Sequence, residues 1–296
     1  MPFWKNDKAN NSSLSISELA VLNLAMVCIA TSGVLGRSLS IPPPLAIWWR
    51  AVFALLFLGI FCWWQGMSFQ ITQKRNRRIV FGAGLLFTAH WVTYFYALQW
   101  SNVPIAMLSV FTYPAMTTLL EPLILRQKFQ KIHLWLAGLV LIGIYFLVPE
   151  SFDLKHGKTA GLIMGLVSAF VYSVRNILMK TQVDNVEGSV LMTYQVAIAV
   201  IILLPVLAVY PPLPPVDQFP FLIALGLITT AIGHTLFLRS FQYFSISTAS
   251  LISSIQPVYG IILGMLFLGE VPGWRSAFGG LLILSSVIIE ARREVF

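Results

Sequence analysis

Charged residues are scarce in this sequence. Asp, Glu, Lys and Arg together make up 10% of its 296 residues, whereas a soluble globular chain carries roughly 25%. Hydrophobic residues make up 57%, and the mean hydropathy is +0.81. A soluble protein of this length needs a polar surface, which this composition cannot supply. The composition therefore indicates a membrane protein before any motif is considered.

Cysteines are few, and the motifs of common enzymes are absent. Cys28 and Cys62 both lie inside apolar runs, so no disulfide framework is expected. The sequence has no GxxxxGK[ST] segment, which argues against an ATP-driven motor. It has no HExxH or CxxC spacing either, so neither a metal nor another cofactor is expected. Glu121 is the acidic residue deepest in an apolar run, and catalysis within the membrane would need a partner acid at the same depth, so no catalytic residue is predicted.

Long apolar runs, in contrast, are abundant. A membrane-spanning helix needs about 20 apolar residues. We count ten such runs and predict an all-α membrane protein with ten transmembrane helices. Their expected positions are 17–37, 43–65, 79–99, 103–125, 130–148, 158–180, 188–210, 218–242, 246–268 and 272–291.

The 19 Lys and Arg residues are unevenly divided between the two sides of this predicted bundle. With the N-terminus inside, the inner side receives Lys5, Lys8, Lys74, Arg75, Arg77, Arg78, Arg126, Lys128, Lys131, Lys180, Arg292 and Arg293. The outer side receives Arg37, Lys155, Lys158 and Arg275. Basic residues favour the cytoplasmic side, so we predict a multi-pass protein of the bacterial inner membrane with both termini in the cytoplasm. The net charge of +8 then reflects topology, and nucleic-acid binding is not expected.

An internal repeat relates the two halves of the chain. Residues 96–120, YALQWSNVPIAMLSVFTYPAMTTLL, align with 239–263, RSFQYFSISTASLISSIQPVYGIIL. Identities at one offset of 143 pair Gln99 with Gln242, Ala106 with Ala249, Leu108 with Leu251, and Pro114 with Pro257. Because each half holds an odd number of spans, the halves should have opposite orientations, as in the inverted repeats of secondary transporters.

The repeat also predicts the division of the chain. We expect cytoplasmic tails at 1–16 and 292–296, a first five-helix repeat at 17–148, an outer linker at 149–157 and a second five-helix repeat at 158–291.

Four segments carry a resemblance to a known family: ATSGVLGRSL, LAIWWRAVFALL, YALQWSNVPIAML and QPVYGIILGMLFLGEVP. With them the chain resembles the EamA-type members of the drug/metabolite transporter superfamily over nearly its whole length. It departs from the family pattern in the first half, where Arg126–Gln127 stands in place of the Gly269–Glu270 of the second half. The resemblance implies import or export of small metabolites through a central cavity open alternately to each side, without fixing the substrate.

Ionisable side chains inside spans are candidates for function. Arg50 lies roughly 9 Å below the outer end of its span, so we expect it to face the outer mouth of the cavity or to snorkel to the interface. Arg175 and Arg239 lie near the inner ends of their spans, where the same alternatives stay open. Glu121 should pair with one of these arginines or with Arg126, or act as a gate or proton carrier.

Polar and aromatic residues gather near the predicted midplane. Ser109, Tyr113, Thr117 and Glu121 recur at every fourth residue, and such a stripe should face a cavity or form a hydrogen-bonded seam with another helix. The predicted central layer is His90, Tyr94, Tyr113, Tyr172 and Gln256. Further substrate-binding candidates are Arg50, Trp49, Arg175 and Asn176. Candidates for gating or proton coupling are Glu121, Arg239, His234 and Gln195. His90 and His234 can instead be packing residues within the bundle.

We therefore predict a secondary transporter that moves a small polar metabolite by alternating access. The excess of Arg over Glu in the spans favours an amino acid or a related zwitterion or organic anion. A lipid-like amphiphile or a nucleoside or cofactor-type solute is the alternative. A channel is disfavoured because no ring of charges or filter segment is present. The expected partners are the substrate, the bilayer and a proton as candidate coupling ion, and the protein is expected to be a monomer or a homodimer.

Overall fold

A computed structural model describes residues 16–126, 132–147, 157–244, 249 and 252–295. Every regular element within these residues is helical, and they contain no strand. The predicted tails, the linker at 149–157 and the first residues of the spans expected at 130 and 246 lie wholly or partly outside the described residues.

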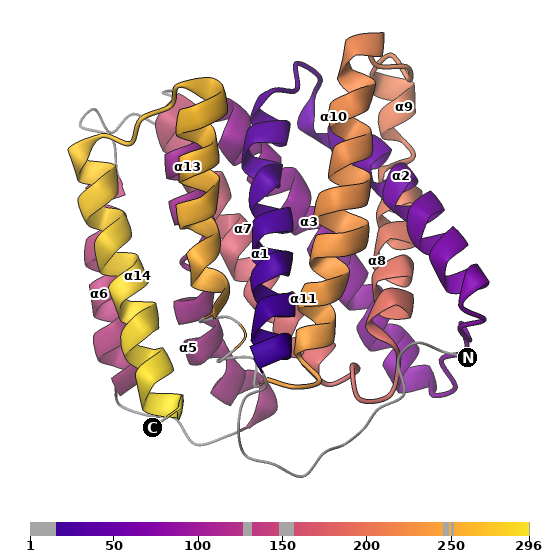
Figure 1. Ribbon diagram of the computed structural model, residues 1–296, viewed down its shortest axis with the longest axis horizontal. Coiled ribbons are helices and arrows are strands. Elements are labelled where there is room, and N and C mark those ends of the chain that lie inside the picture. Colours follow the sequence, from indigo (N-terminus) through magenta and orange to yellow (C-terminus); the bar gives the residue numbers. More distant parts are fainter. Residues whose placement is uncertain (1–15, 127–131, 148–156, 245–248, 250–251, 296) are drawn as a thin grey trace.

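The helices stand side by side as a bundle (Figure 1). In chain order they are α1 (Ile16–Arg37), α2 (Pro43–Trp64), α3 (Lys74–Trp100), α4 (Val103–Val110), α5 (Tyr113–Leu125), α6 (Ile132–Leu147), α7 (Gly157–Lys180), α8 (Gly188–Leu203), α9 (Val206–Val209), the 3₁₀ turn η1 (Val216–Gln218), α10 (Phe219–Ala224), the π-helix η2 (Leu225–His234), α11 (Thr235–Ser240), the 3₁₀ turn η3 (Ser253–Ile255), α13 (Gln256–Leu268) and α14 (Trp274–Val295).

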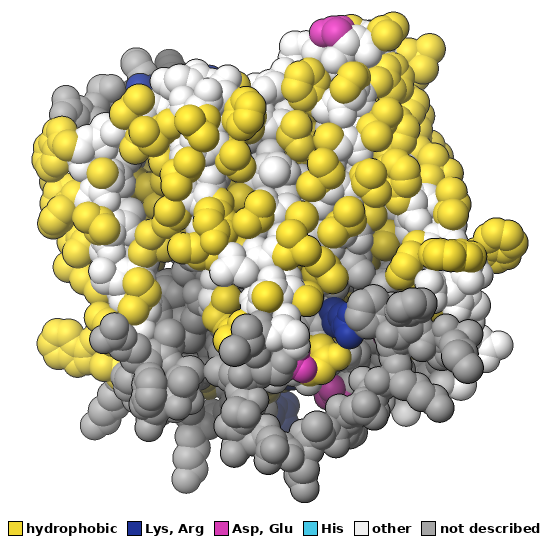
Figure 2. All heavy atoms as spheres, viewed as in Figure 1, with side chains coloured by type: hydrophobic (Ala, Val, Ile, Leu, Met, Phe, Trp, Pro, Cys, Tyr) yellow, Lys and Arg dark blue, Asp and Glu magenta, His cyan; other side chains and the backbone are white. Residues whose placement is uncertain are grey.

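Seven stretches of described helix are long and apolar enough to cross a membrane. They are Ser17–Arg37, Pro43–Trp64, Lys74–Trp100, Val103–Leu125, Gly157–Lys180, Gly188–Val209 and Val216–Ser240. Hydrophobic side chains cover the visible face of the bundle over most of its height, and the charged side chains seen there lie at its two ends (Figure 2). Since this surface suits lipid rather than water, the fold is that of a multi-pass membrane protein.

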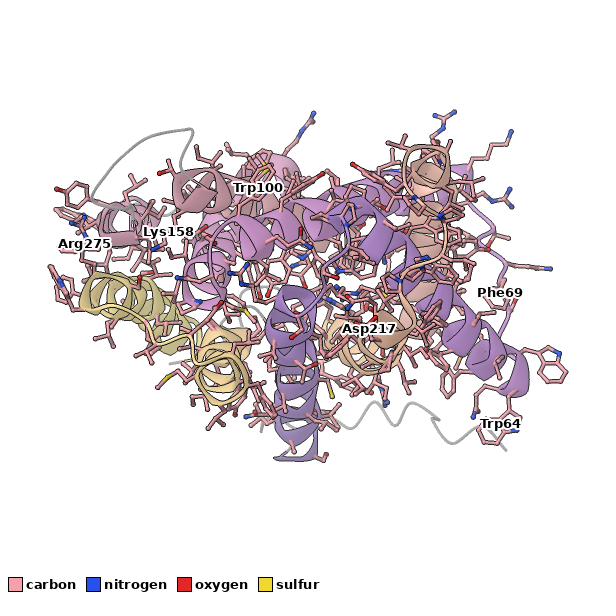
Figure 3. All side chains as sticks on the ribbon, turned by 90° about the horizontal axis from the view of Figure 1, so that it is seen from above. Trp64, Phe69, Trp100, Lys158, Asp217 and Arg275 are labelled. Carbon is pink, nitrogen blue, oxygen red and sulfur yellow. The ribbon has the colours of Figure 1, made fainter. Side chains whose placement is uncertain are left out.

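Exposed tryptophans mark the two ends of the bundle. Trp63 and Trp64, at the end of α2, are 80% and 76% exposed, and Trp100 and Trp274 are exposed at the opposite end. Seen along the helices, Trp64 of α2 and Arg275 of α14 lie at opposite sides of the bundle (Figure 3). Tryptophan favours the boundary between hydrocarbon and water, so these residues indicate the two interfaces.

Four of the predicted spans are not continuous α-helices within the described residues. The run expected at 188–210 is divided into α8 and α9, and the run expected at 246–268 contains the turn η3 before α13. The run expected at 103–125 is divided into α4 and α5 at Phe111–Thr112, and Pro114 occupies the first turn of α5. A proline lacks the N–H that a continuing helix needs but suits a helix start, so the chain restarts its helix there. The run expected at 218–242 has a π-helix at its centre, in η2.

The helices α5 and α13 show the internal repeat in three dimensions. Both contain 13 residues, both have a proline in the first turn, and their positions differ by the offset of 143. Each ends in a left-handed residue, Arg126 with φ 56° and Gly269 with φ 66°. The first half therefore makes the same turn as the second without glycine, which costs an L-residue roughly 1–2 kcal/mol.

Two equivalent glutamines also make equivalent bonds. The Gln99 amide donates to the Ile41 carbonyl at 2.8 Å, and the Gln242 amide donates to the Val183 carbonyl at 2.9 Å. Each bond holds the end of a span to the loop that follows the first helix of its half. This shared role explains why both positions carry glutamine.

Candidate functional site

A narrow cavity of about 20 Å³ lies at the centre of the bundle, between helices of both halves. A volume of this size holds about one water molecule, so the cavity is nearly closed. Its walls are formed by Ile29, Ser32, Arg50, His90, Trp91, Tyr94, Met107, Val110, Phe111, Tyr113, Tyr172, His234 and Gln256. The five residues of the predicted central layer thus share one cavity with Arg50 and His234.

Arg50 points into this cavity and not toward the outer mouth. Its side chain is 1% exposed, its Nε donates to the Thr230 hydroxyl at 2.8 Å, and its guanidinium lies 4.1 Å from the centre of the Trp91 ring. Snorkelling to the interface is therefore ruled out for this conformation. The expectation of an outer-mouth position was wrong because it used only the depth of Arg50 along α2. The Thr230 hydroxyl of η2 and the Trp91 ring of α3, which hold the guanidinium, draw it into the centre of the bundle.

Two buried arginines enclose a pair of aromatic rings. The Arg50 guanidinium lies over Trp91, the Trp91 and Phe87 rings are 4.2 Å apart, and the Arg175 guanidinium lies 4.2 Å from Phe87. Cation–π contacts of this kind contribute roughly 2 kcal/mol when desolvated. They offset part of the cost of burying two positive charges and fix both guanidiniums in place.

The remaining wall is aromatic and hydroxylic. The His90 ring stacks on Tyr172 at 4.1 Å, and Tyr172 meets Tyr113 edge to face at 4.9 Å. Ser168 of α7 holds His90: its hydroxyl donates to the His90 carbonyl at 2.8 Å and lies 2.7 Å from Nδ1. These contacts with Ser168 hold the His90 ring in the cavity wall.

Several polar atoms around the cavity are buried without a hydrogen-bond partner in the described structure. They include Arg50 Nη2, Trp91 Nε1 and His234 Nδ1. No Asp or Glu is present among the lining residues given above. Buried donors almost always have partners, and a guanidinium is costly to bury without a counter-charge. The arrangement can therefore bind a small anionic group.

The π-helix η2 brings its polar side chains to this cavity. The Thr230 hydroxyl donates to the Leu225 carbonyl, five residues earlier, at 2.9 Å, and Thr230 also receives the bond from Arg50. Gly226 allows η2 to approach α2 closely, because a Cβ there would lie 2.5 Å from Phe53 Cβ. π-Helical turns are rare and often occur at functional sites.

Three other predicted residues form a second buried group beside the cavity. Arg175 Nε donates to Gln195 at 2.7 Å, and its Nη1 donates to Asn176 at 2.9 Å. All three are fully buried. Since these amides occupy the Arg175 guanidinium, it is not paired with Glu121 in the described structure.

The remaining candidates lie away from the cavity. The Trp49 indole donates to the Pro212 carbonyl at 3.0 Å and packs against Phe53. Arg239 lies near the end of α11, and its guanidinium donates to the Tyr243 hydroxyl at 3.3 Å. Glu121 is half-buried in α5 and is not part of the cavity wall.

The polar stripe of α4 and α5 is largely a seam with α7. A Cβ at Gly165 of α7 would lie 1.8 Å from the Ser109 hydroxyl, and the Ser173 hydroxyl of α7 donates to the Tyr113 carbonyl at 2.9 Å. Thr117 donates to the same carbonyl at 2.8 Å. Only Tyr113 of the stripe reaches the cavity, where its hydroxyl bonds to that of Ser253.

Sequence reasoning missed several residues of the cavity and of the bundle ends. Trp91 and Thr230 hold Arg50, and Ser168 holds His90. Their residue types carry no signal, because Trp, Thr and Ser are common in apolar helices. Glu270 pairs with Arg37 at 2.9 Å, and its place in the Gly-Glu segment was a usable signal.

A buried polar cavity between helices of two repeated halves is the arrangement expected of a membrane transport protein. The sequence profile of the EamA-like transporter family matches this chain twice, at residues 16–148 and 159–290. The chain belongs to this family and is a membrane transporter of the drug/metabolite transporter superfamily.

Individual relatives agree with this assignment. The pseudopaline exporter CntI of Pseudomonas aeruginosa (strain UCBPP-PA14) is 22% identical over 282 residues, covering 93% of this chain and 95% of that protein. An uncharacterized transporter of Archaeoglobus fulgidus is 26% identical over 200 residues, covering 68% and 71%. A solved crystal structure matches with a TM-score of 0.69 and 19% identity, covering 94% of this chain and 98% of that one. At this identity the structural match shows the fold alone.

Proposed function

We propose that this transporter carries a small metabolite with a carboxylate group, of the amino-acid or organic-anion class, through the central cavity. The observation that supports this is the Arg50 guanidinium, which is buried beside the cavity with Nη2 lacking an acceptor in the described structure. A carboxylate supplies both the acceptor and the counter-charge, and arginine can bind it with two parallel bonds. Trp91 Nε1 is a further donor to the same group.

The aromatic wall is suited to the rest of such a molecule. Tyr172 stacks on His90 and meets Tyr113 edge to face, and all three line the cavity. An apolar or aromatic part packs on these rings, and an ammonium group is attracted to their faces. The combination favours a zwitterion over a simple inorganic anion.

We also propose that the protein has ten spans in the inner membrane, with both termini in the cytoplasm and inverted repeats at 17–148 and 158–291. Supporting the inversion, the first helices of the two halves run in opposite directions. α1 ends beside Gln99, to whose carbonyl Arg37 donates at 3.0 Å, and α7 begins beside Trp100, whose carbonyl lies 2.8 Å from the Cβ position of Gly157. Inverted repeats suit alternating access around a central site.

We further propose that the protein exports its substrate and that transport is coupled to protons. The relative named as an exporter, which this chain matches over 93% of its length, supports export. Glu121 is the proposed proton carrier, because a half-buried carboxylate inside a span can exchange its proton when its surroundings change.

A thermal-shift screen of metabolites on the purified protein, followed by counterflow in proteoliposomes, tests the proposal. We expect an amino acid or organic anion to raise the unfolding temperature and to show saturable exchange. The matching primary amine, which lacks only the carboxylate, should do neither. Equal stabilisation by the amine would exclude the carboxylate site, and flux that never saturates would indicate a channel.

A further inference from the structure

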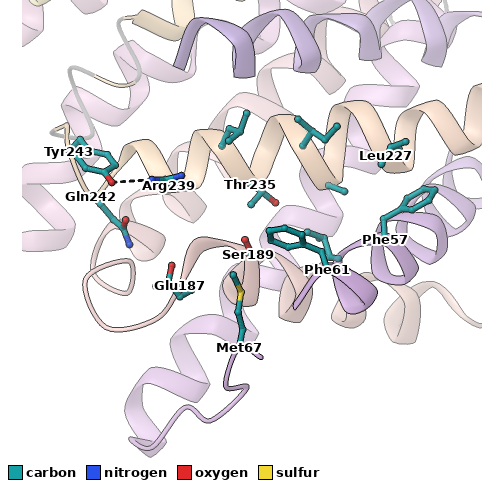
Figure 4. Close-up of a pocket in the computed structure, with 14 residues that line it drawn as sticks. Phe57, Phe61, Met67, Glu187, Ser189, Leu227, Thr235, Arg239, Gln242 and Tyr243 are labelled. Atoms are coloured by element: carbon teal, nitrogen blue, oxygen red, sulfur yellow. Dashed lines mark hydrogen bonds between the residues drawn. The ribbon is translucent and has the colours of Figure 1, made fainter. Parts of the chain in front are cut away.

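A second and larger cavity, of about 280 Å³, lies between α2, the start of α8 and the η2–α11 helix (Figure 4). None of its lining residues lines the central cavity. Phe57, Leu227 and Ala231 line its apolar part, and Glu187, Arg239 and Tyr243 line its charged part. The volume is at the lower end of the range for small-molecule sites, which begins at about 300 Å³.

The lining of this second cavity changes from charged to apolar along its length. Figure 4 shows Arg239 and Tyr243 at one end and Leu227 and Phe57 at the other. Arg239 and Leu227 are twelve positions apart, at most about 18 Å at the α-helical rise of 1.5 Å per residue and less across the π-helical η2. This distance is about half of a hydrocarbon layer of about 30 Å.

The charged end lies at the level of the lipid headgroups. It includes Met67, which follows α2 and its exposed Trp63 and Trp64. Tryptophans of this kind mark the membrane interface. The apolar end consequently lies within the hydrocarbon layer, where Ile60 and Ile228, in the flanking helices α2 and η2, are exposed to the surroundings.

We propose that this second cavity binds a phospholipid with a zwitterionic headgroup that carries a primary ammonium, of the phosphatidylethanolamine class. The phosphate lies at Arg239, the ammonium at Glu187, and one acyl chain runs along Phe57 and Leu227. The two charges come from different walls, α11 and the residue before α8. A headgroup with separate negative and positive ends complements this pair, as a singly charged headgroup does not.

A hydroxyl between the two ends supports the same occupant. Thr235 Oγ1 is buried in the cavity wall and has no hydrogen-bond partner in the described structure. Thr235 lies one turn of helix from Arg239, toward the apolar end. The ester oxygens of a glycerophospholipid lie at this depth below the phosphate and can accept its bond.

Native mass spectrometry of the full-length protein in detergent tests the proposal. The protein is equilibrated with equal amounts of phosphatidylethanolamine and phosphatidylcholine that have identical acyl chains. We expect the ethanolamine lipid to be retained about fivefold more, because its ammonium can donate a hydrogen bond to the Glu187 carboxylate whereas the methylated choline nitrogen has no N–H, and one such bond contributes about 1 kcal/mol. Glu187→Gln should abolish this preference, and Ala231→Phe, which fills the apolar part, should reduce retention of both lipids.

A matched control keeps the result interpretable. Glu18→Gln removes an acidic side chain in the first turn of α1, outside the cavity, and should leave the preference intact. Glu187 is exposed and makes no side-chain capping bond, so its variant should fold. Equal retention of the two lipids by the unmodified protein would overturn the proposal. Unchanged retention in Ala231→Phe would also overturn it, as would displacement of the lipid by soluble phosphoethanolamine.

Discussion

Arg37 Nε lies 2.9 Å from a carboxylate oxygen of Glu270, 233 residues further along the chain. The second Glu270 oxygen accepts the backbone N–H of Val103 at 2.6 Å, and Arg37 Nη1 donates to the Gln99 carbonyl at 3.0 Å. One ion pair therefore ties the ends of α1, α3 and α13 to the start of α4. This is the outer end of the bundle in the proposed topology.

The equivalent position at the other end uses different chemistry. Lys180, at the offset of 143 from Arg37, donates to the carbonyls of Phe241 and Phe244 at 2.5 and 3.3 Å. Backbone carbonyls replace the carboxylate there. The Glu270 carboxylate is therefore used at only one end of the bundle, so a substitution of Glu270 should loosen that end and leave the Lys180 end unchanged.

Glu270→Gln should loosen the end of the bundle that carries Arg37. Glutamine keeps an acceptor for the Val103 N–H but loses the charge. We expect a membrane-impermeant maleimide added on this side to modify a cysteine at position 32 about fivefold faster, the factor for one such ion pair. The measurement uses Ser32→Cys in a protein with Cys28→Ser and Cys62→Ser.

Glu187→Gln, at the opposite end of the bundle, is the matched control for that experiment and should leave the labelling rate unchanged. An equal rate in the Glu270→Gln and unmodified proteins would show that the ion pair does not limit opening. Acceleration by both variants would indicate a general loosening of the fold.

Arg50→Met should weaken binding of a carboxylate substrate without unfolding the protein. A charge-assisted bond to a buried arginine contributes about 1.5–3 kcal/mol, so we expect the affinity to fall at least about tenfold in isothermal titration. The variant loses the bond to Thr230 and the contact with Trp91, but it also removes the desolvation penalty of a buried guanidinium, so the unfolding temperature without substrate should change little. Arg78→Gln, an exposed position near the start of α3 that lines neither cavity, should bind normally. Normal affinity in Arg50→Met would place the site elsewhere.

Hydropathy alone predicted most of the helices, because about 20 apolar residues can satisfy their backbone in lipid only as a helix. It did not predict the direction in which polar side chains point. Trp49 and Arg50 are adjacent, yet one bonds to Pro212 near the bundle end and the other lies at the centre over Trp91. A rotation of 100° per residue separates them, and the rotation of a helix depends on its neighbours.

The site itself could be predicted only in part for the same reason. His90, Tyr113 and Tyr172 were identifiable because polar aromatics near the midplane rarely face lipid. The π-helix that places Thr230 beside Arg50 depends on the close approach at Gly226. That packing involves α2 and η2, which are far apart in sequence and have no local pattern to reveal it.

Tyr113→Phe should weaken substrate binding through its bond to Ser253. The two hydroxyls join α5 of the first half to η3 of the second half at the cavity wall. We expect Tyr113→Phe and Ser253→Ala each to lower affinity by about 1 kcal/mol, the usual contribution of one hydrogen bond. In a double-mutant cycle the combined variant should lose little more than either one. Fully additive losses would show that the two hydroxyls act independently.

Glu121→Gln should separate transport from the proton gradient. Glutamine has similar size but cannot exchange a proton, so uptake into proteoliposomes should become insensitive to an imposed pH difference while counterflow persists. Asp184→Asn, outside the spans and outside both cavities, should keep the dependence of the unmodified protein. Proton dependence that survives in Glu121→Gln would assign coupling to another group.

Gly165→Ala tests whether the polar stripe of α4 is a seam or part of the cavity. A Cβ at Gly165 would lie 1.8 Å from the Ser109 hydroxyl, so α4 and α7 must separate, at a cost of about 1–3 kcal/mol. We expect a lower unfolding temperature, which Ser109→Gly in the same protein should restore by removing the clashing group. Gly138→Ala, where nothing lies within 4 Å, should be neutral or slightly stabilising because alanine favours helix. If Gly165→Ala left stability unchanged and weakened substrate binding instead, Ser109 would belong to the substrate cavity and not to the seam.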